Sequence, residues 1–238
     1  MPLSSVVGAQ SIIKPGVCTS STRPASPYDG QVIYETDTDK IAVYDSSAWV
    51  YKTGTTAPTN PGLVPMVPTS VAVGSGTGTA NALGQVTFSG ASSVSLNGVF
   101  TSACLNYKMV CQYTVSTGQD TRIRLRASGS DNSTASSYVV QSNISTNGTV
   151  SGDDVANSSA AINFNAATTL INVLSQEFFN PQIAGATAIL GSAMNNVNGG
   201  YFTVSGCTHN QTVSYDGFTL FGSSGTMTGT VSVYGYNQ

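Results

Sequence analysis

Apolar and polar positions alternate in three short stretches near the N-terminus. Residues 31–35, 41–45 and 48–52 (QVIYE, IAVYD and AWVYK) each show the period of two that is typical of a β-strand. The segments between them, TDTDK and SS, are rich in turn-forming residues. We therefore predict a small three-stranded meander. A sheet of this size buries too little apolar surface to be stable alone, so we expect it to dock on another body.

A longer series of alternating stretches runs from Gln85 to the C-terminus. Clusters of Gly, Asn, Asp and Ser separate about eight or nine of them, a spacing that predicts an antiparallel β-sandwich or jelly roll. Residues 169–182 (TLINVLSQEFFNPQ) also fit a helical turn, and a strand is only slightly favoured there. Alternation in residues 107–115 places five side chains on one face, namely Tyr107, Met109, Cys111, Tyr113 and Val115.

The two series are separated by a stretch of different composition. Residues 56–84 are rich in Pro, Gly and Thr, and no charged residue occurs between Thr53 and Leu105. This composition is typical of an extended connector with polyproline character. The sequence thus predicts an all-β chain with an N-terminal attachment module at 1–55, a linker at 56–84 and a sandwich head at 85–238.

The charge content of the chain is low. Charged residues make up 8% of 238 residues, hydrophobic residues make up 40%, and the net charge is −3. This apolar content argues against disorder. Without a basic field we expect no nucleic-acid partner. A neutral β surface tends to associate unless its edges are covered, so we expect a homo-oligomer.

The N-terminal 16 residues lack the basic start and apolar run of a signal peptide, and no stretch has the length of a membrane span. We expect no membrane insertion, and a protein that stays in a cytoplasm or leaves it by lysis. The cysteine spacing matches no zinc or redox motif. Buried free thiols are favoured over disulfides or metal ligands for all four cysteines, Cys18, Cys104, Cys111 and Cys207.

Few residues suggest catalysis or metal binding. His209 has Ser205 and Asp216 nearby in sequence, but no nucleophile elbow is present, and we favour a polar loop histidine. No cofactor is expected. Nothing selects a carboxylate pair for glycoside hydrolysis from the four candidates Asp153, Asp154, Glu177 and Asp216.

The acidic turn places Glu35, Asp37 and Asp39 at alternate positions. Calcium loops use similar spacing but also need a turn glycine and a distal bidentate carboxylate, and neither is where it should be. A solvated hairpin tip is therefore favoured over a metal site.

Three arginines occupy one face of a predicted strand, because Arg122, Arg124 and Arg126 alternate with Ile123 and Leu125. Like charges at this spacing repel each other unless they are neutralised. An anionic ligand or a neighbouring subunit's carboxylates would neutralise them. We favour the simpler interpretation, a solvated face that is paired with two carboxylates of the same chain, Asp120 and Asp131.

The segment PxxPYDGQVIYETDTDKIAVYDSSAWV resembles a small module of tailed-bacteriophage structural proteins. In those proteins a PxxGQxxYxTDTxxxxxxxGxxWV-like stretch precedes a linker and a β-rich distal domain. Ser46-Ser47 replaces the usual turn glycine. The segments NGVFTSACLNYKMVCQYTVST, RIRLRASGSD, SSYVVQ and TGTVSVYGYN are similar to a β-sandwich domain of phage fibres and appendages. The matching module positions are Pro24, Pro27, Gly30, Gln31, Tyr34, Thr36, Asp37, Thr38 and Trp49.

The resemblance implies a non-enzymatic virion protein that forms a homotrimer and is assembled in the host cytoplasm. Its N-terminal module would attach to capsid or tail proteins, and the sandwich would point outward. A fibre-like appendage and a capsid decoration or cement protein remain alternatives. The expected attachment residues are Tyr34, Asp37, Asp39 and Trp49.

A host-surface glycan or protein is a further expected partner. Tyr234 and Tyr236 are expected to contribute to its binding, because they lie in a neutral Asn/Ser/Thr-rich surface. A depolymerase of envelope polysaccharide is less favoured, because the head has five carboxylates after residue 130 and no tryptophan.

Overall fold

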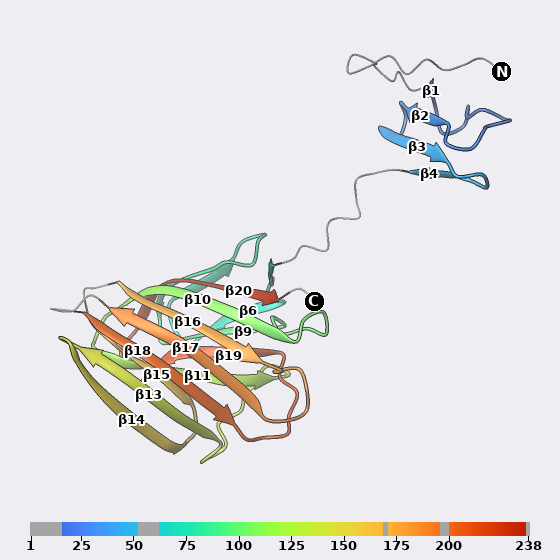
Figure 1. Ribbon diagram of the computed structural model, residues 1–238. Helices are drawn as coiled ribbons and strands as arrows, with labels where there is room; N and C mark the ends of the chain where they lie inside the picture. Colours follow the sequence, from blue (N-terminus) through green and yellow to red (C-terminus); the bar gives the residue numbers. More distant parts are fainter. Residues whose placement is uncertain (1–15, 52–61, 169–170, 196–199, 237–238) are drawn as a thin grey trace. The chain divides into compact units, whose positions relative to one another are not determined.

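The computed structural model describes residues 16–51, 62–168, 171–195 and 200–236 (Figure 1). All regular secondary structure in these ranges is β, which confirms the predicted fold class. The chain divides into two units, residues 1–59 and residues 60–238, and each is described by itself.

The first unit is a four-stranded sheet of β1 (Gly16–Cys18), β2 (Val32–Glu35), β3 (Lys40–Tyr44) and β4 (Trp49–Tyr51). Strands β2, β3 and β4 form the predicted antiparallel meander, and β1 adds parallel to β2. The β3–β4 turn contains Ser46 at a φ of 74°, a left-handed conformation for which glycine is better suited. The Asp45 carboxylate stabilises this turn, because its Oδ1 accepts from the Ala48 N–H at 2.9 Å.

The second unit consists of two sheets that enclose one core (Figure 1). In spatial order, the larger sheet contains β14 (Thr149–Ser158), β13 (Tyr138–Thr146), β18 (Tyr201–His209), β17 (Thr187–Asn195), β16 (Asn172–Phe179), β10 (Asn106–Val115), β20 (Met227–Tyr236), β8 (Val86–Ala91) and β7 (Thr77–Ala80), and β5 (Leu63–Pro65) also pairs with β20. The smaller sheet contains β12 (Ser130–Asp131), β11 (Gln119–Ala127), β19 (Gly217–Gly222), β9 (Ser93–Asn97) and β6 (Ser70–Val73), and β15 (Ala161–Ala166) also pairs with β11.

Aromatic side chains from both sheets meet in the core. The Phe178 ring lies 5.0 Å from that of Phe100 and 5.3 Å from that of Phe218, and Tyr107 lies 4.8 Å from Phe100. The five β10 residues that were expected to share a face are all buried. Strand β16 occupies most of the stretch that also fitted a helix, so the strand interpretation is confirmed.

The boundary between the units differs from the prediction. The sequence predicts a linker at 56–84, whereas β5, β6 and β7 lie in that range and pair with β20, β9 and β8. The half-buried Val71 and Val73 pack against the core of the head. The linker prediction is therefore wrong from Leu63 onward, and residues 52–61 lie outside the described ranges.

Tight pairing explains why this stretch forms strands. The turn between β6 and β7 contains Gly76 at a φ of 68°, where a Cβ would lie 2.0 Å from the Ser89 carbonyl oxygen. Glycine thus permits the chain to cross from one sheet to the other. Strands of three or four residues depend on partners that are distant in sequence, so a local composition argument misreads them as linker.

Candidate functional site

One face of the N-terminal sheet is covered by the ion pair between Arg23 and Glu35. Glu35 is completely buried, and its carboxylate accepts from Arg23 Nε at 2.5 Å, from Thr38 Oγ1 at 2.9 Å and from the Tyr51 hydroxyl at 2.9 Å. The Arg23 hydrogen bond lowers the pKa of the Glu35 carboxyl and raises the pKa of the guanidinium. The expectation of a fully solvated acidic turn is therefore wrong for Glu35.

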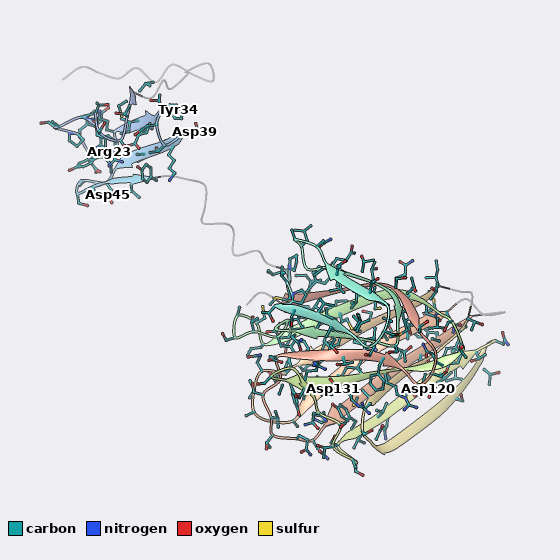
Figure 2. All side chains as sticks on the ribbon, turned by 180° about the vertical axis from the view of Figure 1, so that it is seen from behind. Arg23, Tyr34, Asp39, Asp45, Asp120 and Asp131 are labelled. Carbon is teal, nitrogen blue, oxygen red and sulfur yellow. The ribbon has the colours of Figure 1, made fainter. Side chains whose placement is uncertain are left out.

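The other two acidic side chains of this turn are exposed, as expected. Asp37 accepts from the Ser20 N–H at 2.8 Å and from the Ser20 hydroxyl, and these bonds lower the pKa of its carboxyl. Asp39 accepts from the Tyr34 hydroxyl, which raises the pKa of Tyr34 (Figure 2). Both carboxylates are thus held within the unit.

The opposite face of the same sheet is apolar and open. Strand register places Tyr34 opposite Ile41, and Val32 opposite Val43. Val17 lies beside Tyr34, and Val50 lies opposite Val43. Val17 is 64% exposed and Ile41 is 45% exposed. We call this surface the open face and define it by Val17, Val32, Tyr34, Ile41, Val43 and Val50.

Only part of the predicted attachment set lies on the open face. Tyr34 belongs to it, and Asp39 borders it through the Tyr34 hydroxyl. Trp49 lies on the other face, beside Tyr44 at a ring distance of 5.5 Å. The sequence did contain a sign of this open face. Apolar residues occur at both odd and even positions of β2 and β3, a pattern that is typical of a sheet covered on both faces.

Two of the three arginines of β11 pair with the two carboxylates that the favoured interpretation names, but all three side chains are half-buried, so the expectation of a solvated face is wrong. Arg122 pairs with Asp120 at 3.1 Å, and Arg126 pairs with Asp131; Figure 2 labels the two carboxylates. Arg124 Nε donates to the Ser159 carbonyl at 3.1 Å, and its guanidinium lies 4.7 Å from the centre of the Phe221 ring.

The predicted tyrosine pair lies on the outward face of β20. Tyr234 and Tyr236 are both half-buried. The Tyr236 hydroxyl donates to Glu177 Oε1 at 2.6 Å, which raises its pKa to about 12. Lys108 Nζ lies 3.8 Å from the same carboxylate oxygen. The tyrosine hydroxyl is thus engaged in a small surface network.

His209 is not a loop residue, in contrast to the prediction. It ends β18 and is completely buried, with Nε2 2.6 Å from the Tyr215 hydroxyl and the ring 4.0 Å from that of Tyr138. Burial lowers its pKa to about 4. Asp216 accepts from the Ser128 N–H at 3.2 Å, so it is not the partner that orients this imidazole.

The remaining chemical groups have ordinary structural roles. The thiols of Cys104, Cys111 and Cys207 are buried and unpaired, as expected, while Cys18 is half-buried. Burial raises the pKa of Cys207 to about 12. Within the described ranges, no three His, Cys, Asp or Glu side chains are grouped to hold a metal ion. No helix in that part of the chain is long and apolar enough to cross a membrane.

The outward face of the larger head sheet holds a groove of about 960 Å³. It lies over β13, β18 and β17, and its lining includes Val139, Leu190, Val204 and Gly206. The sequence analysis did not identify these residues. The sign of an apolar outer surface was present, because apolar side chains occur at both odd and even positions of β17 and β18.

Comparisons with known proteins give little further guidance. No family model matches the chain, and no curated protein matches it. A solved structure of peanut lectin with a nine-residue peptide has a TM-score of 0.27 and 11% sequence identity, and the match covers 75% of this chain and 93% of the lectin. A likeness at this level carries no conclusion about ligand or activity.

Proposed function

We propose that this chain is a non-enzymatic structural protein of a tailed-bacteriophage virion. Its N-terminal unit fixes it to a tail or capsid protein through the open face, and its head is the outward part, which binds the host surface. The observation that carries the proposal is the open face itself, an apolar sheet surface on a unit of very small size.

The physical reason lies in the size of the unit. The unit spans residues 1–59, and a domain of about 60 residues buries only about 60% of the surface of its unfolded chain, so its stability is marginal. Here one face of the sheet is occupied by the Arg23–Glu35–Tyr51 network, and the other presents Val17 and Ile41 to solvent. Packing this face on a larger body would supply the missing burial.

Residues of the phage-module pattern support the proposal because they have structural roles in the unit. Gly30 has a φ of 80° at the turn before β2, where glycine is favoured. Thr38 donates to the buried Glu35, and Asp37 accepts from Ser20. The pattern thus describes residues that form this small sheet, and the open face is left for attachment.

The first test is the location of the protein on particles. Antibodies against the full chain should label virions of the phage or prophage that carries the coding sequence. Label on the tail supports a fibre-like appendage, and label on the capsid supports a decoration protein. Unlabelled particles would reject the proposal.

The second test concerns the open face. Full-length protein should rebind to particles that lack it, and Ile41→Lys should abolish rebinding because it places a charge on the exposed apolar surface. Ala25→Lys adds the same charge in an exposed loop of the unit and should rebind normally. Equal rebinding by both variants would exclude the open face as the attachment surface.

A further inference from the structure

The outward face of the smaller head sheet holds most of the positive charge of the head. Residues 60–238 contain four cationic and six anionic side chains, which gives this part of the chain a net charge of −2. Three of the four cations nevertheless alternate along β11 on one face of the sheet, namely Arg122, Arg124 and Arg126. We call these three side chains the arginine row.

One member of the arginine row has no counter-charge. Among the described residues, Arg124 has no carboxylate partner, whereas the other three cations of the head are paired. Arg124 is also half-buried, so its guanidinium has lost part of its hydration without the ion pair that usually compensates for that loss. An anion that the described part of the chain does not supply would complete this site.

The Arg124 guanidinium is held in a fixed position. Its Nε donates to the Ser159 carbonyl at 3.1 Å, and its Nη2 lies 3.5 Å from the Ser159 hydroxyl. The guanidinium lies over the Phe221 ring, 4.7 Å from the ring centre. Because these contacts already order the side chain, an anion that binds there does not have to restrict it further. The Nη1 N–H groups have no hydrogen-bond partner among the described residues.

A second guanidinium lies beside the first. Arg122 is two residues away on the same strand face, at a distance of about 7 Å between Cα atoms. Its Nη2 donates to Asp120 at 3.1 Å, and its Nε has no hydrogen-bond partner among the described residues. The two arginines and Asp120 together have a charge of +1. Like charges at this spacing repel each other, and an anion that contacts both guanidinium groups would remove the repulsion.

We propose that Arg122 and Arg124 bind one singly charged oxyanion. The charge of +1 matches a sugar carboxylate or a phosphodiester, and guanidinium groups are suited to both because they offer several N–H donors in one plane. Asp120 pairs with the first arginine of the row and Asp131 with the last (Figure 2). A polyanion that followed the row, such as a nucleic acid, would meet a carboxylate at each end.

The source of the anion rests on the proposed function, in which the head binds the host surface. Acidic sugars and phosphodiester-linked polymers of a cell envelope both offer single anionic groups that are separated by neutral sugar. The site itself depends only on residues of the head. Binding of a small anion therefore tests it without particles or host cells.

The test is a titration of the full chain labelled with ¹⁵N-arginine and observed by NMR. The chain contains four arginines, so each Nε–H signal can be followed separately. Sodium glucuronate or sodium dimethyl phosphate, added at constant ionic strength, should shift the signals of Arg122 and Arg124 until they saturate at millimolar concentration. Glucose, which has no charge, should leave them unchanged. Saturation by glucuronate alone identifies a carboxylate site, and saturation by dimethyl phosphate alone identifies a phosphodiester site.

Two variants separate this site from a general effect of charge. Arg124→Gln should weaken the binding that Arg122 reports by about 10-fold or more, because it removes a charged hydrogen-bond donor. Lys108→Gln removes the same charge from the larger sheet and should bind as the wild type does. Circular dichroism checks that both variants are folded, and the wild-type titration is decisive even if one of them is not.

Two results would overturn the inference. One is a wild-type chain in which neither anion produces a saturable shift up to about 100 mM. The other is equal binding by Arg124→Gln and the wild type. Labelled particles combined with either result would leave the proposed function intact, whereas unlabelled particles combined with saturable anion binding would reject the proposed function and leave this site standing.

Discussion

The buried histidine makes the stability of the head depend on pH in a defined window. His209 Nε2 shares a hydrogen bond of 2.6 Å with the Tyr215 hydroxyl, whose oxygen accepts from Asn132 Nδ2. Desolvation by burial is the largest cause of the low pKa of this imidazole, and the backbone of Ser137 offsets it only in part. A proton added to this ring would place a positive charge in the core.

The magnitude follows from the two pKa values. His209 has a pKa of about 4 in the folded chain, against 6.5 for an unperturbed histidine. Each pKa unit corresponds to about 1.4 kcal/mol, so protonation of His209 at low pH should lower the free energy of unfolding of the head by about 3 kcal/mol in total. Because the folded pKa is the lower one, stability is complete above pH 6.5, decreases as the pH falls, and levels off near pH 4.

Urea unfolding at several pH values measures this effect. Far-UV circular dichroism reports mainly on the head, and fluorescence of the single tryptophan, Trp49, reports on the N-terminal unit. The free energy of unfolding of the head should decrease by up to about 1.4 kcal/mol per pH unit between pH 6.5 and 4.5. His209→Gln, which keeps a neutral polar side chain, should remove this slope.

The chain contains one histidine, so no other imidazole can account for the slope. Equal stability of the wild-type head at pH 7 and pH 4.5 would refute the reasoning. So would a slope that persists in His209→Gln.

Three further predictions concern packing and thiols. Arg126→Ala should destabilise the head by about 2–4 kcal/mol, because it leaves the partly buried Asp131 without its cationic partner. Arg122→Ala removes a more exposed ion pair and should cost less than about 1 kcal/mol. Urea unfolding compares the two variants, and equal losses would contradict the difference in burial between the two ion pairs. Phe178→Ala should lower the free energy of unfolding by about 3–5 kcal/mol through an unfilled cavity, and a loss below about 1 kcal/mol would exclude Phe178 from the packed core. A thiol-reactive dye should label Cys18 quickly in the native chain and the other cysteines only after unfolding; fast labelling of several thiols would contradict their burial.

Patterns that repeat along the chain were readable from the sequence. The alternation in residues 107–115 predicted a strand with one buried face, and all five of its members are buried. The arginine row and its two carboxylates were paired correctly, because they lie within a few residues of each other and strand geometry brings them together. The meander of the first unit was readable because short turns join its strands.

Contacts between segments that are distant in the chain could not be predicted from the sequence. The β5, β6 and β7 strands are too short to show a pattern and form only because β20, β9 and β8 lie beside them. His209 is buried because β18 ends against Tyr138 and Tyr215.

The sequence by itself determined the all-β class, the low surface charge and the faces of the long strands, since these follow from local composition and a period of two. Only the tertiary structure decided which apolar face is covered and which is open. That choice depends on which strands pair and which layers stack, and both are set by burial summed over the whole fold.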